Sequence, residues 1–528
     1  MDTRRRGPFL LALDQGTTSS RAIVFDARGR ALGTGQHALP QIYPAPGHVE
    51  HDPEAIWATQ RSAWVEAIAA AELTPADIAG IGIANQRETA VVWERATGRP
   101  VHHAIVWQDR RTAGACATLA AEGWGPTVAA RTGLRLDPYF SATKVAWILD
   151  HVTGAREAAA RGELLFGTVD AWLLWRLTGG RSHATEATNA SRTMLLDIWS
   201  LAWDAELLER LGIPRAMLPE VRATCGDFGR SDADVFGAEV PVVAMAGDQQ
   251  AALFGQGCFS PGGVKNTYGT GCFLLMHAGG REGQGRRGEA GAAVPLPPAA
   301  QSSLLRTVAF WDGRGGAEYA VEGSVFSAGS AVEWLREVGL IRRATDAGRL
   351  AATVPDAGGA WFVPAFTGLG APDWDPTARG AVLGLTRGVT RAHLCRAVLE
   401  AIAHQTREVF ALMCRETGLV PTELRVDGGA SRSDLLMQIQ ADLLGVPVLR
   451  PRQPESTAFG AALLAGLGLG VWRDRAEIGR LLPPGRRFVP AGGEAVRARA
   501  AAAWRRAVDR SLRWDLQPGT SGAETGTP

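Results

Sequence analysis

The chain opens with apolar runs separated by turn residues, a pattern that predicts short strands joined by tight turns. The run Leu10–Leu13 is followed by a Gly/Thr/Ser turn at 15–20 and by a second run, Ala22–Phe25. Another turn at 26–29 leads into a third predicted strand, so the N-terminus is expected to form the edge of an antiparallel or mixed sheet. Because Asp14 ends the first run, that run is too short for a signal peptide or a membrane span.

Helical and further strand patterns follow this opening. Asp52-Pro53 predicts the start of a helix, because Asp accepts hydrogen bonds at a helix N-terminus and Pro suits the first turn. Glu455-Ser456-Thr457 is the predicted cap of the last long helix. The other predicted elements are strands at Ile78–Ala84, Val91–Trp93 and Ala104–Trp107 and helices at His393–Glu416, Asp434–Leu444 and Ala458–Leu467.

The second half of the chain repeats the opening pattern. Val264–Tyr268 leads through Gly269-Thr270-Gly271 into Cys272–Met276, which is again a strand, a Gly/Thr turn and a strand. Two copies about half a chain apart suggest two related domains that face a common cleft, and their separation is too long for a solenoid repeat. We therefore predict an α/β protein with mixed sheets flanked by helices, divided into domains at residues 8–256 and 257–514.

Composition narrows the class of protein. The chain has 528 residues, 46% of them hydrophobic, which is enough for two cores. Its 55 basic and 54 acidic residues give a net charge of +1, so no overall field would recruit nucleic acid or an anionic membrane. The 6 cysteines form no Cys-x-x-Cys pair, which favours reduced thiols in a cytoplasmic protein. Residues 279–300 are expected to be a mobile surface insertion and residues 515–528 a disordered tail.

Three glycine-containing turns have the composition of phosphate-binding loops. A phosphate needs backbone N–H donors and a close approach of the chain, and glycine allows both. Gly16-Thr17-Thr18-Ser19 adds hydroxyl donors and precedes Arg21, Gly269-Thr270-Gly271 adds one hydroxyl, and Gly428-Gly429 lies where a strand leads into a helix. Each fits an ordinary tight turn as well, but three at separate strand ends favour a nucleotide site. The chain lacks the Gly-x4-Gly-Lys-Ser/Thr loop of P-loop enzymes.

Two carboxylates follow predicted strands. Asp14 stands directly before the first turn, where a carboxylate can hold Mg²⁺ through water or simply cap the turn. Asp248 follows the apolar run Val240–Ala246. It can cap the next helix, or it can accept a hydroxyl proton during phosphoryl transfer.

A series of motifs, in order from about Leu11 to Trp472, resembles those of glycerol kinases within the FGGY-type carbohydrate kinase family. The combination of the second and third motifs is the most particular to that branch. The motifs are Leu13-Asp-Gln-Gly-Thr-Thr-Ser-Ser-Arg21, Ala84-Asn-Gln-Arg-Glu-Thr89, Val106-Trp-Gln-Asp-Arg-Arg-Thr112, Asp137-Pro-Tyr-Phe-Ser141, Gly167-Thr-Val-Asp-Ala-Trp172, Thr188-Asn-Ala-Ser-Arg-Thr193, Gly247-Asp-Gln-Gln250, Asn266-Thr-Tyr-Gly-Thr-Gly271, Gly368-Leu-Gly-Ala-Pro372 and Asp427-Gly-Gly429.

The resemblance implies two actin-like (ribonuclease-H-like) domains that close on MgATP and transfer phosphate from ATP to glycerol, giving sn-glycerol 3-phosphate. The first domain would bind the polyol and the second the nucleotide, in a cytoplasmic homo-oligomer, a dimer or a tetramer. Asp248 would be the catalytic base and Asp14 the metal-associated carboxylate. The implied glycerol-binding residues are Arg87, Glu88, Trp107, Tyr139, Asp248, Gln249 and Phe273. The implied nucleotide-binding residues are Thr17, Thr18, Ser19, Arg21, Thr270, Gly329, Glu333, Gly429 and Ser433.

Departures from the family pattern keep two alternatives open. Glu333 replaces a usual Gln and Ser433 a frequent Asn on the nucleotide side, and a carboxylate cannot donate as an amide does. Asp373 and His404 replace residues that are commonly aromatic. The alternatives are a kinase for another polyol or sugar, such as erythritol or xylulose, and a weakly catalytic actin-like nucleotide sensor.

Overall fold

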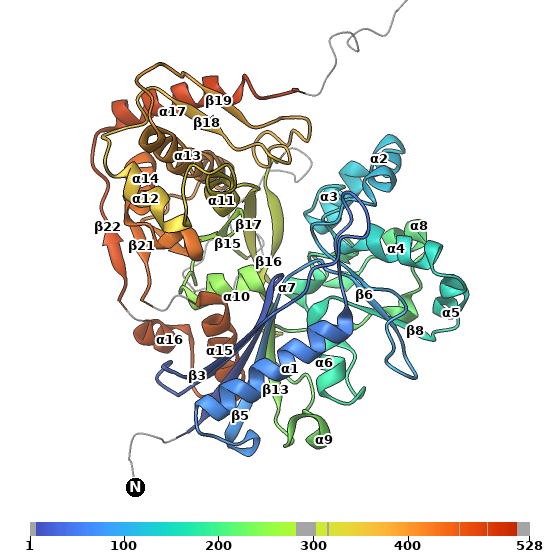
Figure 1. Cartoon of the computed structure of the whole chain (residues 1–528). Coiled ribbons are helices and arrows are strands. Elements are labelled where there is room, and N and C mark those ends of the chain that lie inside the picture. Colours follow the sequence, from blue (N-terminus) through green and yellow to red (C-terminus); the bar gives the residue numbers. More distant parts are fainter. Residues whose placement is uncertain (1–6, 281–301, 314–315, 453–454, 483, 515–528) are drawn as a thin grey trace, which may run out of the picture. The chain divides into compact units, whose positions relative to one another are not determined.

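The computed structural model describes residues 7–280, 302–313, 316–452, 455–482 and 484–514 (Figure 1). They form two compact units. Unit 1 comprises Met1–Pro261, His277–Val321 and Glu455–Pro483, and unit 2 comprises Gly262–Met276, Glu322–Pro454 and Pro484–Pro528. The predicted tail and nearly all of the predicted insertion lie outside the described residues.

Unit 1 is built on a five-stranded mixed sheet, as the apolar pattern of the N-terminus predicts. The strand order is β13-β5-β1-β2-β3, with β1 antiparallel to β2, β2 antiparallel to β3, and β1, β5 and β13 parallel. The expected third strand is therefore the edge of this sheet. Its members are β1 (Phe9–Gln15), β2 (Ser19–Phe25), β3 (Ala31–Ala38), β5 (Ile78–Asn85) and β13 (Val242–Gly247).

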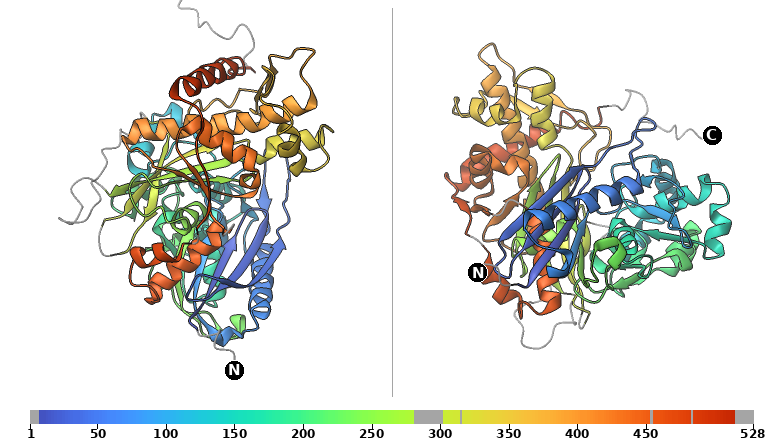
Figure 2. Two further views of the ribbon diagram at one scale, coloured as in Figure 1. Left: turned by 90° about the vertical axis from the view of Figure 1, so that its left-hand side faces the viewer. Right: turned by 60° about the horizontal axis from the view of Figure 1, so that its bottom comes forward.

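Helices cover both faces of this sheet, which explains why β1 is an unbroken apolar run. Leu11 and Leu13 pack in one cluster with helix α1 (Pro53–Ala70), whereas Leu10 and Ala12 pack in a second cluster with α15 (Ser456–Leu469). A strand buried on both sides loses the alternation of polar and apolar positions. In Figures 1 and 2, α15 lies against the strands of the N-terminal third despite its distance in sequence.

Small residues let the helices approach closely. A Cβ on Gly33 of β3 would lie 2.2 Å from the backbone oxygen of Ala67 in α1. On the other face, a Cβ on Gly460 of α15 would lie 1.8 Å from the oxygen of Ala251 in α10 (Asp248–Gly255). Such distances are impossible for real atoms, so only glycine permits this packing.

We expect Gly460→Ala to lower the free energy of unfolding by about 1–3 kcal/mol, because the added methyl group forces α10 and α15 apart. Denaturant unfolding followed by circular dichroism measures the effect. The matched control is Gly479→Ala in α16 (Arg475–Leu481), where a Cβ meets nothing within 4 Å. That change should raise stability by about 0.5–1 kcal/mol. Equal behaviour of the two variants would contradict the packing argument.

The predicted strand near residue 78 is β5 of the five-stranded sheet, and the predicted strands near residues 91 and 104, the last shortened to Ala104–Ile105, are among the remaining elements of unit 1. They are β4 (Glu50–His51), β6 (Val91–Glu94), β7 (Ala104–Ile105), α2 (Ala113–Ala121), α3 (Gly125–Thr132), α4 (Ser141–His151), α5 (Ala155–Ala160), β8 (Leu164–Gly167), α6 (Val169–Leu177), β9 (Ala184–Glu186), α7 (Ala187–Ala190), β10 (Leu196–Asp197), β11 (Ala202–Trp203), α8 (Ala205–Leu211), β12 (Glu220–Arg222), α9 (Ala233–Phe236) and 3-10 turns at Pro75–Asp77 and Arg215–Met217.

A second sheet repeats the arrangement of the first. Its strand order is β16-β17-β15-β14-β20-β21-β22, and β14 is antiparallel to β15 and parallel to β20, just as β1 is to β2 and β5. The repeated hairpin read from the sequence is thus a repeat of topology. The strands are β14 (Val264–Tyr268), β15 (Cys272–Gly280), β16 (Leu305–Phe310), β17 (Glu318–Val325), β20 (Leu424–Asp427), β21 (Val448–Arg450) and β22 (Arg486–Phe488).

Unit 2 contains the helices predicted at His393–Glu416 and Asp434–Leu444, and both are confirmed within a few residues. Among the described residues, no helix combines the length and apolar character needed to cross a membrane. The other elements are α11 (Gly329–Glu337), α12 (Ala344–Ala351), β18 (Trp361–Val363), β19 (Ala381–Leu383), α13 (Arg391–Thr417), a 3-10 turn at Gly429–Arg432, α14 (Asp434–Leu444) and α17 (Glu494–Val508).

Helix α15 begins at the predicted Glu455-Ser456-Thr457 segment, but the expected side-chain cap is absent. Glu455 occupies the N-cap position, but its side chain accepts no capping hydrogen bond. Instead its carboxylate forms an ion pair with Arg21, which lies 434 positions earlier in the chain. Arg21 offers a charged partner that a neutral backbone N–H does not match.

Candidate functional site

Three parallel strands of unit 1 end at one edge of the sheet, and predicted site residues stand at or just after each end. In the strand register, Asp14 of β1 is next to Ala84 of β5, and Asn85 of β5 is next to Gly247 of β13. The polar residues 85–89 at the end of β5 therefore lie next to Asp248, which directly follows β13. The carboxyl ends of parallel strands are the usual place for ligands in such sheets.

A buried cluster of charges joins these strand ends. Arg192 donates from Nε to Glu88 Oε1 at 2.7 Å, and Arg87 Nε lies 3.7 Å from the same oxygen. Arg87 Nε also lies 3.4 Å from Asp248 Oδ1. The side chains of Arg87, Glu88 and Arg192 are at most 2% exposed, whereas Asp248 is 26% exposed. Two guanidinium groups and two carboxylates balance in charge, and the only accessible carboxylate is that of Asp248.

The backbone around this cluster is constrained. Glu88 has φ 62, the left-handed region, and the N–H of Thr89 donates across it to the carbonyl of Arg87 at 2.8 Å. Ser141 holds the Glu88 carbonyl with a hydrogen bond of 2.9 Å. A Cβ on Gly247 would lie 2.7 Å from Arg87 Cδ, so only glycine leaves room for the Arg87 side chain at this position. Strain of this kind persists where surrounding contacts fix a functional side chain.

The residues after Asp248 fix its carboxylate. Gln249 donates from its backbone N to Asp248 Oδ1 at 2.7 Å and from Nε2 to Oδ2 at 3.1 Å. Gln250 turns the other way, accepting from Arg87 Nη1 at 3.3 Å and donating to Thr307 Oγ1 at 3.2 Å. The predicted residue Gln249 thus orients Asp248, and Gln250 supports Arg87.

Two aromatic rings adjoin the charged cluster. Trp107 and Tyr139 meet edge to face with 5.6 Å between ring centroids, and the Arg192 guanidinium lies 5.7 Å from the Tyr139 ring. Lys144 is fully buried and donates to the Tyr139 carbonyl at 2.5 Å, and burial lowers its pKa to about 8. Lys144 therefore holds the ring-bearing segment from inside. Phe273, another of the implied glycerol-binding residues, lies on β15 in unit 2.

The first phosphate turn is formed as predicted and is tied to the aromatic wall. Gly16 N donates to Ser19 O at 3.0 Å, which closes the turn between β1 and β2. Trp107 donates from its indole N to Thr17 Oγ1 at 2.9 Å, while Thr18 is exposed. Arg21 lies between two carboxylates, paired with Glu455 and 3.8 Å from Asp14 Oδ2.

Asp14 fits the role of a magnesium-associated carboxylate. Its side chain is 12% exposed at the end of β1, directly before the phosphate turn. Mg²⁺ in phosphate-transfer sites usually keeps several waters and takes one or two carboxylates together with substrate phosphates. A single carboxylate beside a phosphate turn meets this requirement, and the described residues contain no group of three or more His, Cys, Asp or Glu side chains placed to hold a metal ion.

Unit 2 carries the second and third phosphate turns at one strand edge. Gly329 N donates to Gly269 O at 3.0 Å, and the backbone of residue 328 donates to Thr270 O at 2.8 Å. A Cβ on Gly428, at φ 84, would lie 2.5 Å from Tyr268 O. The structure therefore brings Thr270, Gly329 and the Gly428-Gly429 turn together within unit 2.

Glu333 and Ser433, the two nucleotide-side residues that depart from the family pattern, both make contacts within their own helices. Glu333 accepts from Arg336 Nε at 2.6 Å within α11, and this hydrogen bond lowers the pKa of the Glu333 carboxyl. Ser433 caps α14, accepting from Leu436 N at 3.3 Å. Asn would cap a helix equally well, so this exchange is conservative for the fold.

The other departures, at Asp373 and His404, are also in structural contacts of unit 2. Asp373 pairs with Arg505 at 3.0 Å, and the His404 ring stacks on Trp504 with 5.2 Å between centroids. Burial lowers the pKa of His404 to about 3, so the ring is neutral at physiological pH.

Arg192 is the main residue that sequence reasoning missed. It belongs to the motif Thr188-Asn-Ala-Ser-Arg-Thr193, to which no role was assigned. Its side chain is 0% exposed, and its Nε donates to Glu88 Oε1 at 2.7 Å. The available signal was an arginine within a run of small residues, a setting in which a charge needs a specific partner.

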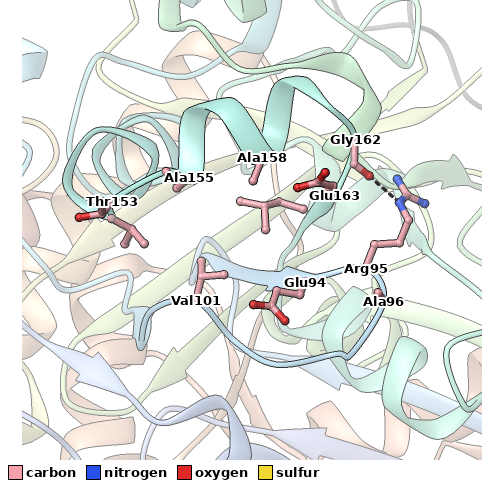
Figure 3. Close-up of a pocket in the computed structure, with 12 residues that line it drawn as sticks. Glu94, Arg95, Ala96, Val101, Thr153, Ala155, Ala158, Gly162 and Glu163 are labelled. Carbon is pink, nitrogen blue, oxygen red and sulfur yellow. Dashed lines mark hydrogen bonds between the residues drawn. The ribbon is translucent and has the colours of Figure 1, made fainter.

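A pocket of about 470 Å³ lies elsewhere in unit 1 (Figure 3). It is bordered by the segment after β6 and by α5, and its polar groups include Glu94, Arg95 and Glu163. Arg95 points away to donate to Gly162 O at 2.9 Å. No predicted site residue lines this pocket, so it is separate from the charged cluster.

Glycine-containing turns at strand ends, a buried cluster of paired charges and a repeated sheet topology fit a carbohydrate kinase. Family models agree: the N-terminal domain of the FGGY family of carbohydrate kinases matches residues 9–255, and the C-terminal domain of that family matches residues 264–469. The chain belongs to the FGGY family of carbohydrate kinases, and the predicted two-domain fold class is confirmed.

Particular relatives are similar over nearly the whole chain. Glycerol kinase of Trichlorobacter lovleyi is 56% identical over 507 residues, covering 96% of this chain and 99% of the relative. Glycerol kinase 2 of Thermotoga maritima is 53% identical over 508 residues, covering 96% and 99%. The solved structure of Plasmodium falciparum glycerol kinase with ADP matches with a TM-score of 0.87 and 31% identity, covering 96% of this chain and 98% of that one.

Proposed function

We propose that this protein transfers the terminal phosphate of ATP to glycerol and forms sn-glycerol 3-phosphate. The observation that carries the proposal is the cluster of Arg87, Glu88, Arg192 and Asp248, in which one carboxylate remains accessible among buried, paired charges. Identity above 50% to glycerol kinases over 96% of the chain supports the same acceptor.

The chemistry of the cluster favours a small uncharged polyol. A triol has little apolar area, so hydrogen bonds must select it. Arginine donors and carboxylate acceptors can satisfy neighbouring hydroxyl groups, and the Trp107 and Tyr139 rings can cover C–H groups. The balanced charges of the cluster leave no net charge to attract an acidic substrate. A kinase for erythritol, xylulose or another sugar is the alternative to test.

Asp248 is the proposed general base. It is the cluster carboxylate with solvent access, and the two donors of Gln249 hold its oxygens in place. As the acceptor hydroxyl attacks the terminal phosphorus of ATP, Asp248 takes its proton. The alcohol oxygen bonds to phosphorus while the bond from phosphorus to the bridging oxygen breaks, and ADP leaves. The buried Arg87 lies beside Asp248, with Nε 3.4 Å from Asp248 Oδ1.

The phosphate turns are proposed to bind the nucleotide. Thr17, Thr18 and Ser19 offer hydroxyl and backbone donors in unit 1, and Thr270 and the 428–429 glycines offer them in unit 2. Arg21 contributes positive charge once phosphate competes with Glu455 for it. Mg²⁺ near Asp14 would neutralise phosphate charge when bound. We further propose residues 8–256 as the polyol-binding domain and 257–514 as the nucleotide-binding domain of a cytoplasmic homo-oligomer.

Glycerol-dependent ADP release by the purified chain tests the proposed function. We expect turnover with MgATP and glycerol, and oxidation of the product by a dehydrogenase specific for sn-glycerol 3-phosphate. Propane-1,2-diol, which lacks one hydroxyl group, should have a kcat/KM lower by up to about 10⁴–10⁵-fold, because buried polar groups lose their partner. Faster turnover with erythritol or xylulose than with glycerol would assign the acceptor to another sugar. No acceptor-dependent turnover at all would favour the nucleotide-sensor alternative.

A further inference from the structure

A fully buried histidine lies behind the first phosphate turn. His51 is the last residue of β4 and has 0% exposure. It contacts two glutamine side chains, Gln41 and Gln86, on opposite sides of its ring. Each of these glutamines also contacts a backbone carbonyl of the turn. The histidine thus bridges two polar side chains that both reach the phosphate turn.

The hydrogen bonds of Gln41 set the proton on the histidine. The Gln41 amide Nε2 donates to the carbonyl of Thr17 at 2.7 Å and to that of Leu39 at 3.0 Å. Carbonyls can only accept, so the Gln41 oxygen is the group that faces His51 Nε2, at 2.9 Å. His51 must therefore carry its proton on Nε2.

The other side of the ring follows from this assignment. A neutral ring protonated at Nε2 offers Nδ1 as an acceptor, and Gln86 Nε2 lies 3.3 Å from it. The same Gln86 nitrogen donates to the carbonyl of Gly16 at 3.1 Å, while the Gln86 oxygen accepts from Thr89 Oγ1 at 2.9 Å. Every donor in this chain of hydrogen bonds meets an acceptor, and reversing either amide would break at least two bonds.

Fixing these carbonyls also fixes the N–H groups of the turn. In a planar trans peptide the C=O and the following N–H point in opposite directions. The carbonyls of Gly16 and Thr17 are held by the buried Gln86 and the half-buried Gln41, so the N–H groups of Thr17 and Thr18 point the opposite way. Those are two of the backbone donors that a phosphate would use.

We infer that His51 is a positioning residue for nucleotide binding. As the neutral Nε2–H tautomer it holds Gln41 and Gln86, and through them it orients the peptides of the phosphate turn. This inference rests on the proposed function, in that the Gly16–Ser19 turn binds nucleotide phosphate. Burial lowers the pKa of His51 to about 4, which agrees with a ring that stays neutral at physiological pH.

Substitutions at His51 test the inference through direct nucleotide binding. We expect His51→Leu to weaken MgADP binding, measured by calorimetry, about 10–100-fold, the effect of leaving buried amide groups unsatisfied. The KM for ATP should rise in proportion, whereas the KM for glycerol should stay within about threefold. His51→Gln keeps one donor and one acceptor and should restore most of the binding. The matched control is His151→Leu, at an exposed ring stacked on Trp147, which should bind MgADP as wild type does.

The outcomes separate this inference from the proposed function. If wild type binds MgADP but does not phosphorylate glycerol, the proposed function fails while the binding comparison still applies. If wild type is active and His51→Leu binds MgADP like wild type, or raises both KM values equally, the inference is overturned. Should His51→Leu fail to fold, Gln41→Leu removes the side chain that donates to the carbonyls of Thr17 and Leu39 and accepts from His51. This variant must weaken MgADP binding at least severalfold; unchanged binding would overturn the inference.

Discussion

Replacing Asp248 with Asn should lower kcat about 10²–10⁴-fold, the usual contribution of a general base. The amide keeps the Oδ1 acceptor that Gln249 N and Arg87 contact, so the local structure should persist. It cannot take the proton of the attacking alcohol at neutral pH. Because binding groups remain, the KM for glycerol and that for ATP should change only a few-fold. Steady-state kinetics with both substrates varied measure the effects on kcat and on the two KM values separately.

The matched control for Asp248→Asn is Asp474→Asn. Asp474 is also a carboxylate at a helix N-terminus, where it accepts from Glu477 N at 2.8 Å. Asn caps helices as well as Asp does, so this variant should keep wild-type kcat. A kcat for Asp248→Asn within threefold of wild type would remove Asp248 from the role of base. Equal losses in both variants would point to a general effect of reduced charge.

The strand ends and turns could be predicted from the sequence because their signals are local. Apolar runs bounded by Gly, Thr and Asp predict β1, β2, β14 and β15, and the structure confirms all four strands, with β14 at the predicted bounds and the others extended by one to four residues. A polar residue directly after an apolar run must lie near a sheet edge. Placing Asp14 and Asp248 at strand ends therefore required no knowledge of tertiary contacts.

Contacts between distant segments could not be predicted in this way. The pairing of Arg21 with Glu455 depends on α15 packing against the N-terminal sheet, which no local pattern encodes. Capping preferences predict that the Glu455 side chain accepts from the backbone of α15. In the folded chain it pairs with the guanidinium of Arg21 instead. Arg192 escaped notice for the same reason, since its partner Glu88 lies 104 positions earlier. In the sequence, His51 is only the residue before the predicted helix start at Asp52. Its role depends on Gln41 and Gln86, which come from different segments and could not be paired with it from local pattern.

Arg192→Met should lower the free energy of unfolding by about 3–5 kcal/mol, because it removes a charged hydrogen bond of 2.7 Å to the buried Glu88 carboxylate. Arg87 remains, but it lies 3.7 Å from Glu88 and also faces Asp248. The same change should raise the KM for glycerol at least tenfold, since the position of Glu88 depends on the lost hydrogen bond. Denaturant unfolding and steady-state kinetics measure the two effects. Arg192→Lys keeps the charge without the planar guanidinium and should lie between Met and wild type in both measurements.

A second substitution distinguishes stability from function at this site. Removing both partners of a buried pair is far less costly than removing one, because no uncompensated charge remains. The double variant Arg192→Met with Glu88→Gln should therefore recover much of the lost stability. It should not recover glycerol binding, because a neutral amide replaces the carboxylate acceptor for a hydroxyl group. If the double variant regained both, the cluster would serve only the fold, and the buried charges would need another explanation than the recognition of a polyol.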